Sequence, residues 1–495
     1  MRTRTILFTL GAAIASALVA VSCHKIDETR FKELSPITFS EVPDVINVSL
    51  GQVLIYDRLE VKSALPVTYQ WAFGKKKTSS GAGPWDMDSM EIISSDPRIN
   101  YLFTKLGTYI LRLRVDNGED IAYKYFTLNV NSGLDEGLLI LSDAEGGKSE
   151  LTFIKKRTNE EVSENAREIW EDLFGMINPD PELKRGTSLF LSAFSTGGIS
   201  YNHLLLSTDD DHGTIYDIEP KTMTVITGTP MKDQFGTWCC DFSGRQTAGT
   251  GAYTFLRAGD GRVFRHDLFT AFLTERTDVM QTAVAVEKSK DILYSTSAGT
   301  TYCKSLFYTD GFICQPDNNG TTIYRKMPDG WKIVNICSDR DANKTYLLLR
   351  SDSDASSYRI MSTSGSLNSL QDVSEFTAST LNMDANSVFC TSLNSNDAYY
   401  SFGGKVYRWG MTGAPAGNAA ITLPDGEQIC DMATNFTNSV VSGSETFLYI
   451  ATYNPERQGL KGSVFVYDIA TDSLVKSYEG VTGKPVKMLY KYRIS

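Results

Sequence analysis

The chain has 495 residues and a formal net charge of −11, with 41% hydrophobic and 22% charged residues. This acidity, without a block of Lys and Arg, argues against binding to nucleic acid, because such binding requires phosphates to be neutralised. The hydrophobic content is enough for two cores. The 24 Tyr and 24 Phe residues, together with few Pro and many turn-forming residues, favour β structure with many turns.

Residues 1–22 have the pattern of a signal peptide. Arg2 and Arg4 precede an uncharged apolar run over residues 6–21, which is short for a transmembrane helix and suits a signal peptide. The run leads into Ala-Val-Ser-Cys, which resembles the lipobox of bacterial lipoproteins. In that family the Cys is acylated and becomes the N-terminal residue after cleavage. The resemblance predicts lipid attachment at Cys23, and the alternative is an ordinary secreted protein in which Cys23 is incidental.

Residues 23–35 are expected to form a lipidated tether. The sequence Lys-Ile-Asp-Glu at residues 25–28 resembles the Lys-acidic-acidic export signal of Bacteroidota lipoproteins, although Ile26 interrupts it. Two or more acyl chains anchor a protein stably to a bilayer. The resemblance therefore implies an outer-membrane protein that faces the cell exterior, with the lipid on Cys23, including palmitate, as its one attached group and no cofactor. Cleavage moves the formal charge from −11 to −13.

Residues 36–131 are predicted to form an Ig-like β-sandwich. The segment 67–73 alternates so that Trp71 and three other apolar residues share one face, and the segment 107–115 alternates in the same way. Asp-Asn-Gly at residues 116–118 then supplies a tight turn. A buried strand Trp that faces a late aromatic strand is typical of the core of an Ig-type sandwich.

The same segments resemble the polycystic-kidney-disease (PKD) domain, and in particular the PKD-like family of Bacteroidota lipoproteins. The resemblance is carried by Tyr69-x-Trp71-x-Phe73 and by the pattern Leu-Gly-x-Tyr-x-Leu-x-Leu-x-Val-x-Asn over residues 106–117. In that family the module is a spacer or an interaction domain. Trp71 could bind carbohydrate, but its place on the alternating apolar face favours burial.

Residues 135–495 repeat a unit of an apolar strand, a polar turn and a second strand with an aromatic residue. The first strands lie at residues 138–141, 203–206, 253–256, 292–294, 346–349, 398–400 and 447–450. The aromatic residues of the second strands are Phe153, Tyr216, Phe264, Tyr324, Tyr358, Tyr407 and Phe465. Their mean spacing of about 50 residues fits propeller blades of four strands. The pattern predicts a mainly β chain that ends in a seven-bladed β-propeller, with six or eight blades, or a two-sheet sandwich, as alternatives.

One stretch departs from the β pattern. Residues 159–177 place Ala166, Ile169, Trp170, Leu173, Phe174 and Ile177 at helical spacing. Asn-Pro-Asp-Pro at residues 178–181 then ends the pattern. We expect a helical insertion in the first blade, which either packs on the propeller or docks a partner.

No catalytic constellation stands out. The chain has no Gly-x-Ser-x-Gly elbow, no His-Glu-x-x-His motif and no Cys and His cluster with zinc spacing. The densest acidic cluster, at residues 209–213, makes Asp209 and Asp211 weak candidates for binding a cation, although a hairpin turn explains the same residues. This segment and residues 339–346 resemble the Asp-box turns of sialidase-type propellers without the full pattern, which supports a hairpin rather than a sialidase.

A lipid anchor, an Ig-like module and a propeller together resemble the accessory lipoproteins of TonB-dependent, starch-utilisation-like (Sus-like) uptake systems in Bacteroidota. The resemblance implies a non-enzymatic role that binds a glycan or a peptide, or docks on the TonB-dependent transporter and its substrate-binding lipoprotein. A surface glycan-degrading enzyme and a structural or adhesive surface protein are the alternatives.

Overall fold

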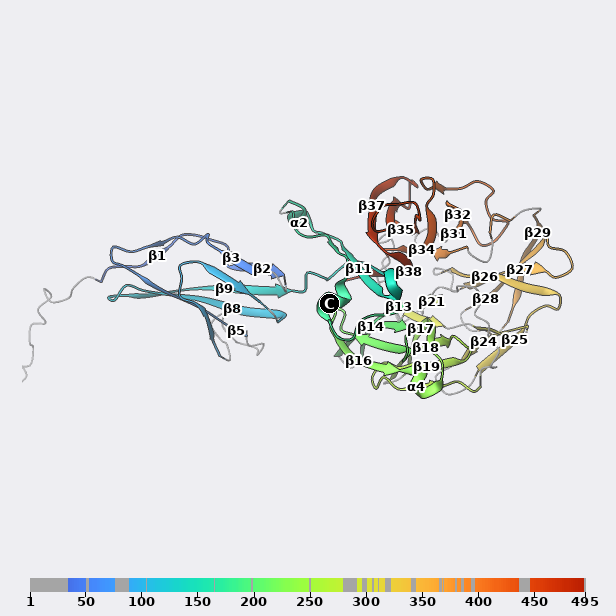
Figure 1. The fold of residues 1–495 in the computed structure, drawn as a ribbon, viewed down its shortest axis with the longest axis horizontal. Coiled ribbons are helices and arrows are strands. Elements are labelled where there is room, and N and C mark those ends of the chain that lie inside the picture. The colour runs from blue at the N-terminus through green and yellow to red at the C-terminus, as the bar shows by residue number, and fades with distance from the viewer. Residues whose placement is uncertain are drawn as a thin grey trace, which may run out of the picture. The chain divides into compact units, whose positions relative to one another are not determined.

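The computed structural model of the chain consists of strands and a few short helices (Figure 1). It describes residues 34–49, 53–75, 89–103, 105–163, 165–196, 199–248, 251–278, 292–295, 301–304, 307–309, 311–316, 322–339, 344–364, 367, 369–378, 381–383, 387–392, 397–435 and 446–493. The predicted signal peptide and Cys23 lie outside these residues. The chain divides into two compact units, Met1–Gly133 and Leu134–Ser495. The sequence predicted the change of domain between residues 131 and 135.

The first unit contains one five-stranded sheet and two two-stranded sheets among its described residues. The five-stranded sheet has the order β2 (Val45–Ser49), β9 (Ile121–Asn131), β8 (Gly107–Asp116), β5 (Thr68–Lys75) and β6 (Glu91–Ser94). The two-stranded sheets pair β1 (Thr38–Phe39) with β4 (Val61–Lys62) and β3 (Val53–Tyr56) with β7 (Ile99–Leu102).

One apolar core joins the sheets of the first unit into a sandwich. It combines side chains of β2, β3, β5, β7, β8 and β9. Trp71 lies at its centre with 1% of its surface exposed, and its ring centroid is 6.2 Å from that of Tyr56 and 6.1 Å from that of Phe126. The prediction that Trp71 is a core residue is therefore confirmed.

The described residues of the second unit form six four-stranded antiparallel sheets. The first combines β12 (Ile169–Trp170), β11 (Ser149–Lys155), β10 (Gly137–Asp143) and β38 (Lys484–Lys491). The second has β13 (Gly186–Thr196), β14 (Ile199–Thr208), β15 (Thr214–Ile218) and β16 (Val225–Pro230). The third has β17 (Cys239–Ala248), β18 (Gly251–Ala258), β19 (Val263–Asp267) and β20 (Leu273–Glu275).

The later sheets follow in chain order. β21 (Ile292–Ser295) pairs with β22 (Thr301–Lys304), and a three-stranded sheet has β23 (Phe307–Thr309), β24 (Phe312–Pro316) and β25 (Thr322–Lys326). The next has β26 (Trp331–Asp339), β27 (Lys344–Ser351), β28 (Ser357–Ser364) and β29 (Gln371–Thr377). The sheet after that has β30 (Phe389–Thr391), β31 (Ala398–Phe402), β32 (Lys405–Trp409) and β33 (Ile421–Thr422). The last sheet has β34 (Gln428–Thr434), β35 (Phe447–Tyr453), β36 (Gly462–Asp468) and β37 (Leu474–Thr482).

The second unit is β-propeller-like, because most of its sheets contact the next sheet through an edge strand. β38 contacts β13 and β34, β13 contacts β17, β17 contacts β22, β21 contacts β26, and β30 contacts both β26 and β34. We call these the inner strands. Figure 1 shows several of them near the middle of the unit, with β16, β29 and β37 at its periphery. Apolar cores fill the spaces between consecutive sheets.

The repeat found in the sequence corresponds to one strand in each of seven sheets. The seven aromatic residues lie on β11, β15, β19, β25, β28, β32 and β36. One pairing was wrong: residues 292–294 do not form the hairpin with Tyr324. β25 instead pairs with β24, where Tyr324 lies opposite the buried Cys314. An additional hairpin, β21–β22, precedes this sheet, which explains the long spacing between Phe264 and Tyr324.

The prediction of a continuous helix over residues 159–177 was also wrong. Two short helices, α2 (Asn159–Ser163) and α3 (Leu173–Ile177), flank the edge strand β12. Asn165 has a φ of 51°, which a right-handed helix does not allow, and Trp170 pairs with Phe153 of β11. The Asp172 side chain caps α3 by accepting a hydrogen bond from the Gly175 N–H at 3.0 Å.

No helix within the described part of the chain has both the length and the apolar character needed to cross a bilayer.

Candidate functional site

Five inner strands share a β-bulge close to the point where each strand begins. The bulged residues are Val486 in β38, Thr187 in β13, Cys240 in β17, Val334 in β26 and Cys430 in β34. A bulge inserts one unpaired residue, so it re-aims the side chain that follows it. All five bulges lie near the beginning of their strands.

In four of these strands the residue after the bulge has a described polar or charged side chain: Ser188, Asp241, Asp431 and Lys487. We call this set the polar ring. Bulges that recur at one position beside each other are a feature of functional rims in β proteins. The polar ring is therefore the candidate site, and its members come from different sheets.

Hydrogen bonds join members of the polar ring across neighbouring sheets. The Ser188 hydroxyl donates to Asp241 Oδ1 at 2.6 Å, and Lys487 Nζ reaches the same oxygen at 3.3 Å. The Met488 N–H donates to Asp431 Oδ2 at 2.7 Å. Three inner strands, β13, β17 and β38, thus converge on one carboxylate.

Burial separates these side chains into two kinds. Ser188 and Asp431 are buried, with 0% and 3% of their surface exposed. The side chains of Asp241 and Lys487 keep 31% and 21% exposed. A buried carboxylate is tolerated only when it is hydrogen-bonded, so Asp431 serves the packing of β34 on β38. Asp241 and Lys487 offer an acceptor and a positive charge to a ligand.

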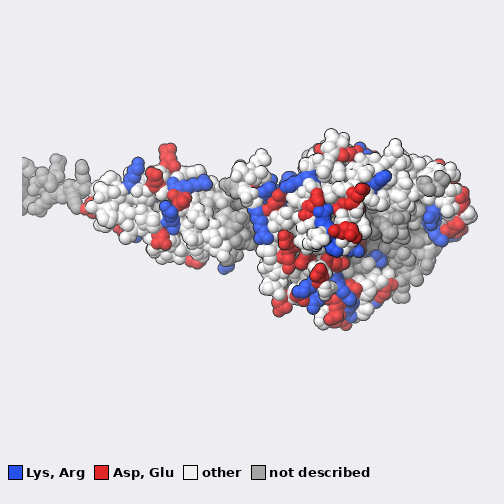
Figure 2. Space-filling view, turned by 45° about the horizontal axis from the view of Figure 1, so that its top comes forward, with Lys and Arg blue, Asp and Glu red and all other residues white. Residues whose placement is uncertain are grey.

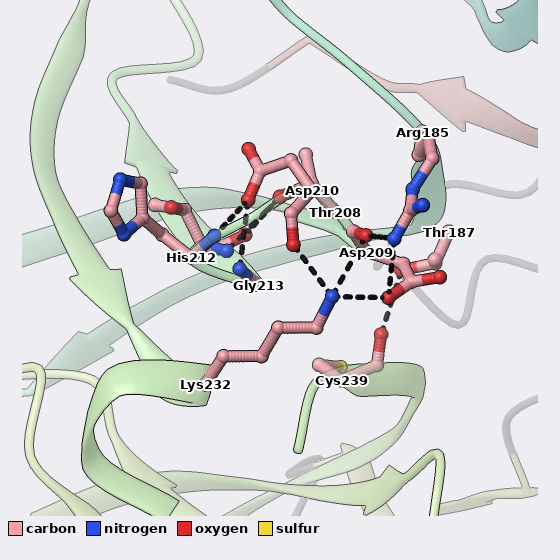
Figure 3. A network of polar contacts seen from close by, with 10 residues as sticks. Arg185, Thr187, Thr208, Asp209, Asp210, His212, Gly213, Lys232 and Cys239 are labelled. Atoms are coloured by element: carbon pink, nitrogen blue, oxygen red, sulfur yellow. Dashed lines mark hydrogen bonds and ion pairs between the residues drawn. The ribbon is translucent and has the colours of Figure 1, made fainter. Parts of the chain in front are cut away.

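A second polar network lies on the loops at the same end of β13 (Figure 3). Lys232 of α4 (Met231–Phe235) donates to three oxygens, which are Asp209 Oδ1 at 2.7 Å, the Asp209 carbonyl at 3.0 Å and the Asp210 carbonyl at 2.6 Å. Arg185 also pairs with Asp209 Oδ1, at 3.1 Å. Thr187 ties this region to β17 by donating to the Cys239 carbonyl at 2.7 Å.

This network explains the acidic cluster at residues 209–213. The ammonium group of Lys232 lies where oxygen ligands from Asp209 and Asp210 converge, so the protein supplies its own cation there. Asp210 accepts hydrogen bonds from the N–H groups of His212 and Gly213 at 3.0 and 2.7 Å, as a turn residue does. Asp211 is exposed. Within the described ranges, no three His, Cys, Asp or Glu side chains are arranged to hold a metal ion.

Two histidines and a carboxylate meet between the second and third sheets. His203 Nδ1 lies 2.8 Å from Asp217 Oδ2. His266 of β19 is 1% exposed, and its Nδ1 has no hydrogen-bond partner in the described part of the chain. Burial lowers the pKa of His266 to about 4, the negative charge of Asp217 opposes this shift, and His203 adds to it. The imidazole is therefore neutral at physiological pH and acts as a packing group.

The surface of the second unit carries both signs of charge. Figure 2 shows acidic and basic side chains interspersed on the visible face. One ion pair reaches inward, because Arg457 lies 2.7 Å from the buried Glu427, whose carboxylate also accepts a hydrogen bond from Thr452. Such a surface favours recognition by hydrogen bonds and local charge rather than by a broad field.

Sequence reasoning missed the polar ring. Alternation treats Ser188, Asp241, Asp431 and Lys487 as ordinary outward residues of separate strands. A possible signal was the repeated polar residue near the beginning of an apolar strand, but a one-residue bulge does not have a sequence pattern of its own.

No family model and no curated protein matches the chain. Among solved structures, a quinoprotein alcohol dehydrogenase-like protein from Bacteroides thetaiotaomicron is 14% identical, with a TM-score of 0.45, covering 93% of this chain and 100% of its own. A DUF4784 family protein from Bacteroides caccae is 8% identical, with a TM-score of 0.27 and coverage of 90% and 96%. The Dos1 propeller is 10% identical, with a TM-score of 0.35 and coverage of 79% and 89%. At these values the matches lend no function to this chain.

Proposed function

We propose that the protein is a non-enzymatic surface lipoprotein, anchored through Cys23, that serves a TonB-dependent, Sus-like nutrient uptake system. Its propeller unit binds a glycan or a peptide, or docks on the transporter and its substrate-binding lipoprotein, through the face that carries the polar ring. The observation that carries the proposal is the convergence of β13, β17 and β38 on the partly exposed pair Asp241 and Lys487.

The proposal takes the second unit as a seven-bladed propeller. It is supported by the cyclic order of contacts among the inner strands and by the seven aromatic residues at equivalent strand positions. Pairing of β38 with β10 joins the last strand of the chain to the first sheet. The first unit is taken as a PKD-type module, supported by Trp71 in the core of its sandwich.

The chemistry of the pair suits a neutral, hydrogen-bonding ligand. Asp241 accepts hydrogen bonds and Lys487 donates them, and each retains exposed surface. Ligand sites combine a few such convergent polar groups on a rigid frame. The Ser188 hydroxyl holds Asp241 in position from the buried side.

An affinity pull-down of the tagged lipoprotein from detergent-solubilised outer membranes tests the proposal. We expect a TonB-dependent barrel and a second lipoprotein to co-purify in near-equal amounts, and the double variant Asp241→Asn, Lys487→Gln to recover several-fold less of both. The matched control is Arg359→Gln, Asp372→Asn, which removes an ion pair of 2.6 Å on the outer strands β28 and β29. Recovery of the protein alone, or equal loss in the control, would overturn the proposal.

A further inference from the structure

The outward face of the five-stranded sheet in the first unit carries aromatic and cationic side chains in its middle. On β8, Leu111, Leu113 and Val115 are buried in the core, so Arg112 and Arg114 point to the other face. On β9, which lies beside β8 in Figure 1, Phe126 and Leu128 are buried, so Tyr123 and Tyr125 point outward.

The register of the two strands brings these four residues together. Arg112 lies opposite Tyr125, and Arg114 lies opposite Tyr123. The two tyrosine rings stack, with centroids 6.3 Å apart and an interplanar angle of 23°. The Arg112 guanidinium lies 5.5 Å from the centroid of the Tyr123 ring, and Tyr123 is 45% exposed. A pair of aromatic rings with a cation over one of them results.

The two arginines differ in their partners. Arg114 forms an ion pair of 2.6 Å with Asp116, and Asp116 is further bound by the Gly118 N–H at 2.8 Å. Arg112 makes no ion pair with any described residue, and its Nε has no acceptor there. An arginine that is half-buried against aromatic rings and lacks a carboxylate is poised to bind one from a ligand.

A row of amide and hydroxyl side chains extends along the same sheet face. The Thr108 hydroxyl donates to Asn129 Oδ1 at 3.1 Å, and Asn129 Nδ2 donates to Asn47 Oδ1 at 3.0 Å. These residues come from β8, β9 and β2, so the row crosses three strands. Amide groups of this kind keep capacity for further hydrogen bonds with hydroxyl groups.

We propose that this face binds an acidic oligosaccharide, with a uronate carboxylate on Arg112 and the apolar side of a sugar ring on Tyr123. The inference goes beyond the proposed function, since it concerns a different unit and a charged ligand. A peptide is less suited to the flat of the sheet around Arg112, because the backbone groups of β8 are already paired with β5 on one side and with β9 on the other. On β8 only side chains remain for recognition, and across β8 and β9 these combine aromatic rings, a cation and hydrogen-bonding groups.

Calorimetric titration of the full-length protein with galacturonate, glucuronate and mannuronate oligosaccharides tests this site. We expect at least one uronate to bind and its carboxyl-reduced counterpart to bind at least about tenfold more weakly, as loss of a charge-assisted hydrogen bond predicts. Arg112→Gln and Tyr123→Ala should each weaken binding about tenfold or more, while Tyr123→Phe keeps it.

The matched control is Arg98→Gln, which removes an exposed arginine of the same unit outside the five-stranded sheet. It should change the affinity less than twofold. Binding of none of the uronates, equal binding of the reduced sugars, or full binding by folded Arg112→Gln would overturn the inference. Equal binding of polyglutamate would also overturn it, because a peptide would then satisfy the site. The variants at Asp241 and Lys487 should leave uronate binding unchanged, which separates this site from the proposed function.

Discussion

The two units solve the problem of burying apolar β surface in different ways. The sandwich has one core, to which six of its strands contribute, with Trp71 at the centre. The propeller-like unit has a series of smaller cores, each shared by neighbouring sheets. In the sandwich, a residue such as Trp71 contributes to the single core that its strands share. In the propeller-like unit, each core depends on the two sheets beside it. The contact between the first and last sheets depends on β38, which pairs with β10 and contacts β34.

The first prediction concerns that last strand and has the largest expected effect. Ending the chain at Gly483 removes β38, which leaves β10 unpaired on one side and takes Met488 and Tyr490 out of a core. It also removes Lys491, which donates to the Asp135 carbonyl at 2.9 Å. We expect the free energy of unfolding of the second unit to fall by more than about 5 kcal/mol. This matches or exceeds the total stability of many domains, so the second unit should fail to fold.

Limited proteolysis of this shortened chain measures the effect directly. The fragment from the first unit should survive while the second is degraded. A chain that ends at Arg493 keeps β38 and is the control. A protease-resistant second unit without β38 would contradict the role given to this strand.

The second prediction compares two buried tryptophans, one in each unit. Trp71 and Trp409 are each 1% exposed. Replacing either by Ala should cost about 3–5 kcal/mol, because a large buried side chain is lost and a cavity remains. We expect thermal unfolding to show that Trp71→Ala lowers only the transition of the sandwich and Trp409→Ala only that of the propeller-like unit. A shift of both transitions by either variant would mean that the units do not unfold separately.

The third prediction is a pH dependence confined to the second unit. The pKa of His266 is about 4 in the fold and about 6.5 when the chain is unfolded. Between these values the unfolded chain binds more protons, so stability falls as the pH is lowered through this window. The free energy of unfolding should fall by about 3 kcal/mol between pH 7 and pH 4, since each unit of pKa shift corresponds to about 1.4 kcal/mol.

Denaturant unfolding at pH 7, 6, 5 and 4 checks this dependence. The groups that act on His266 are Asp217 and Asp267, which raise its pKa, and His203, which lowers it. His266→Leu should remove most of the slope between pH 6.5 and 4, whereas His212→Gln, at an exposed histidine, should leave it in place. An unchanged slope in His266→Leu would assign the dependence to other groups.

Much of the fold could be predicted from the sequence where the pattern is local. Strand alternation identified the core face around Trp71, and the aromatic repeat identified one strand in each of seven sheets of the second unit. The sequence pattern failed where pairing between distant segments decided the secondary structure. Ile169 and Trp170 have helical spacing with their neighbours, but they pair as an edge strand with β11. Likewise β24, rather than residues 292–294, pairs with the strand of Tyr324.

The candidate site was less accessible to sequence reasoning. Asp209 and Asp211 were found by their density, but the partner that matters, Lys232, lies about twenty residues away and is brought to Asp209 by α4. The polar ring depends on four bulges, and each bulge is set by how its strand pairs with the next. Register of this kind follows from the assembled sheets, and local residue patterns do not specify it.

The claim that the chain consists of two units with separate cores is tested most directly by differential scanning calorimetry of the full-length protein. The account predicts two resolved unfolding transitions. Trp71→Ala should shift only the transition of the first unit, and ending the chain at Gly483 should abolish the transition of the second unit. A single cooperative transition that both changes shift together would contradict it.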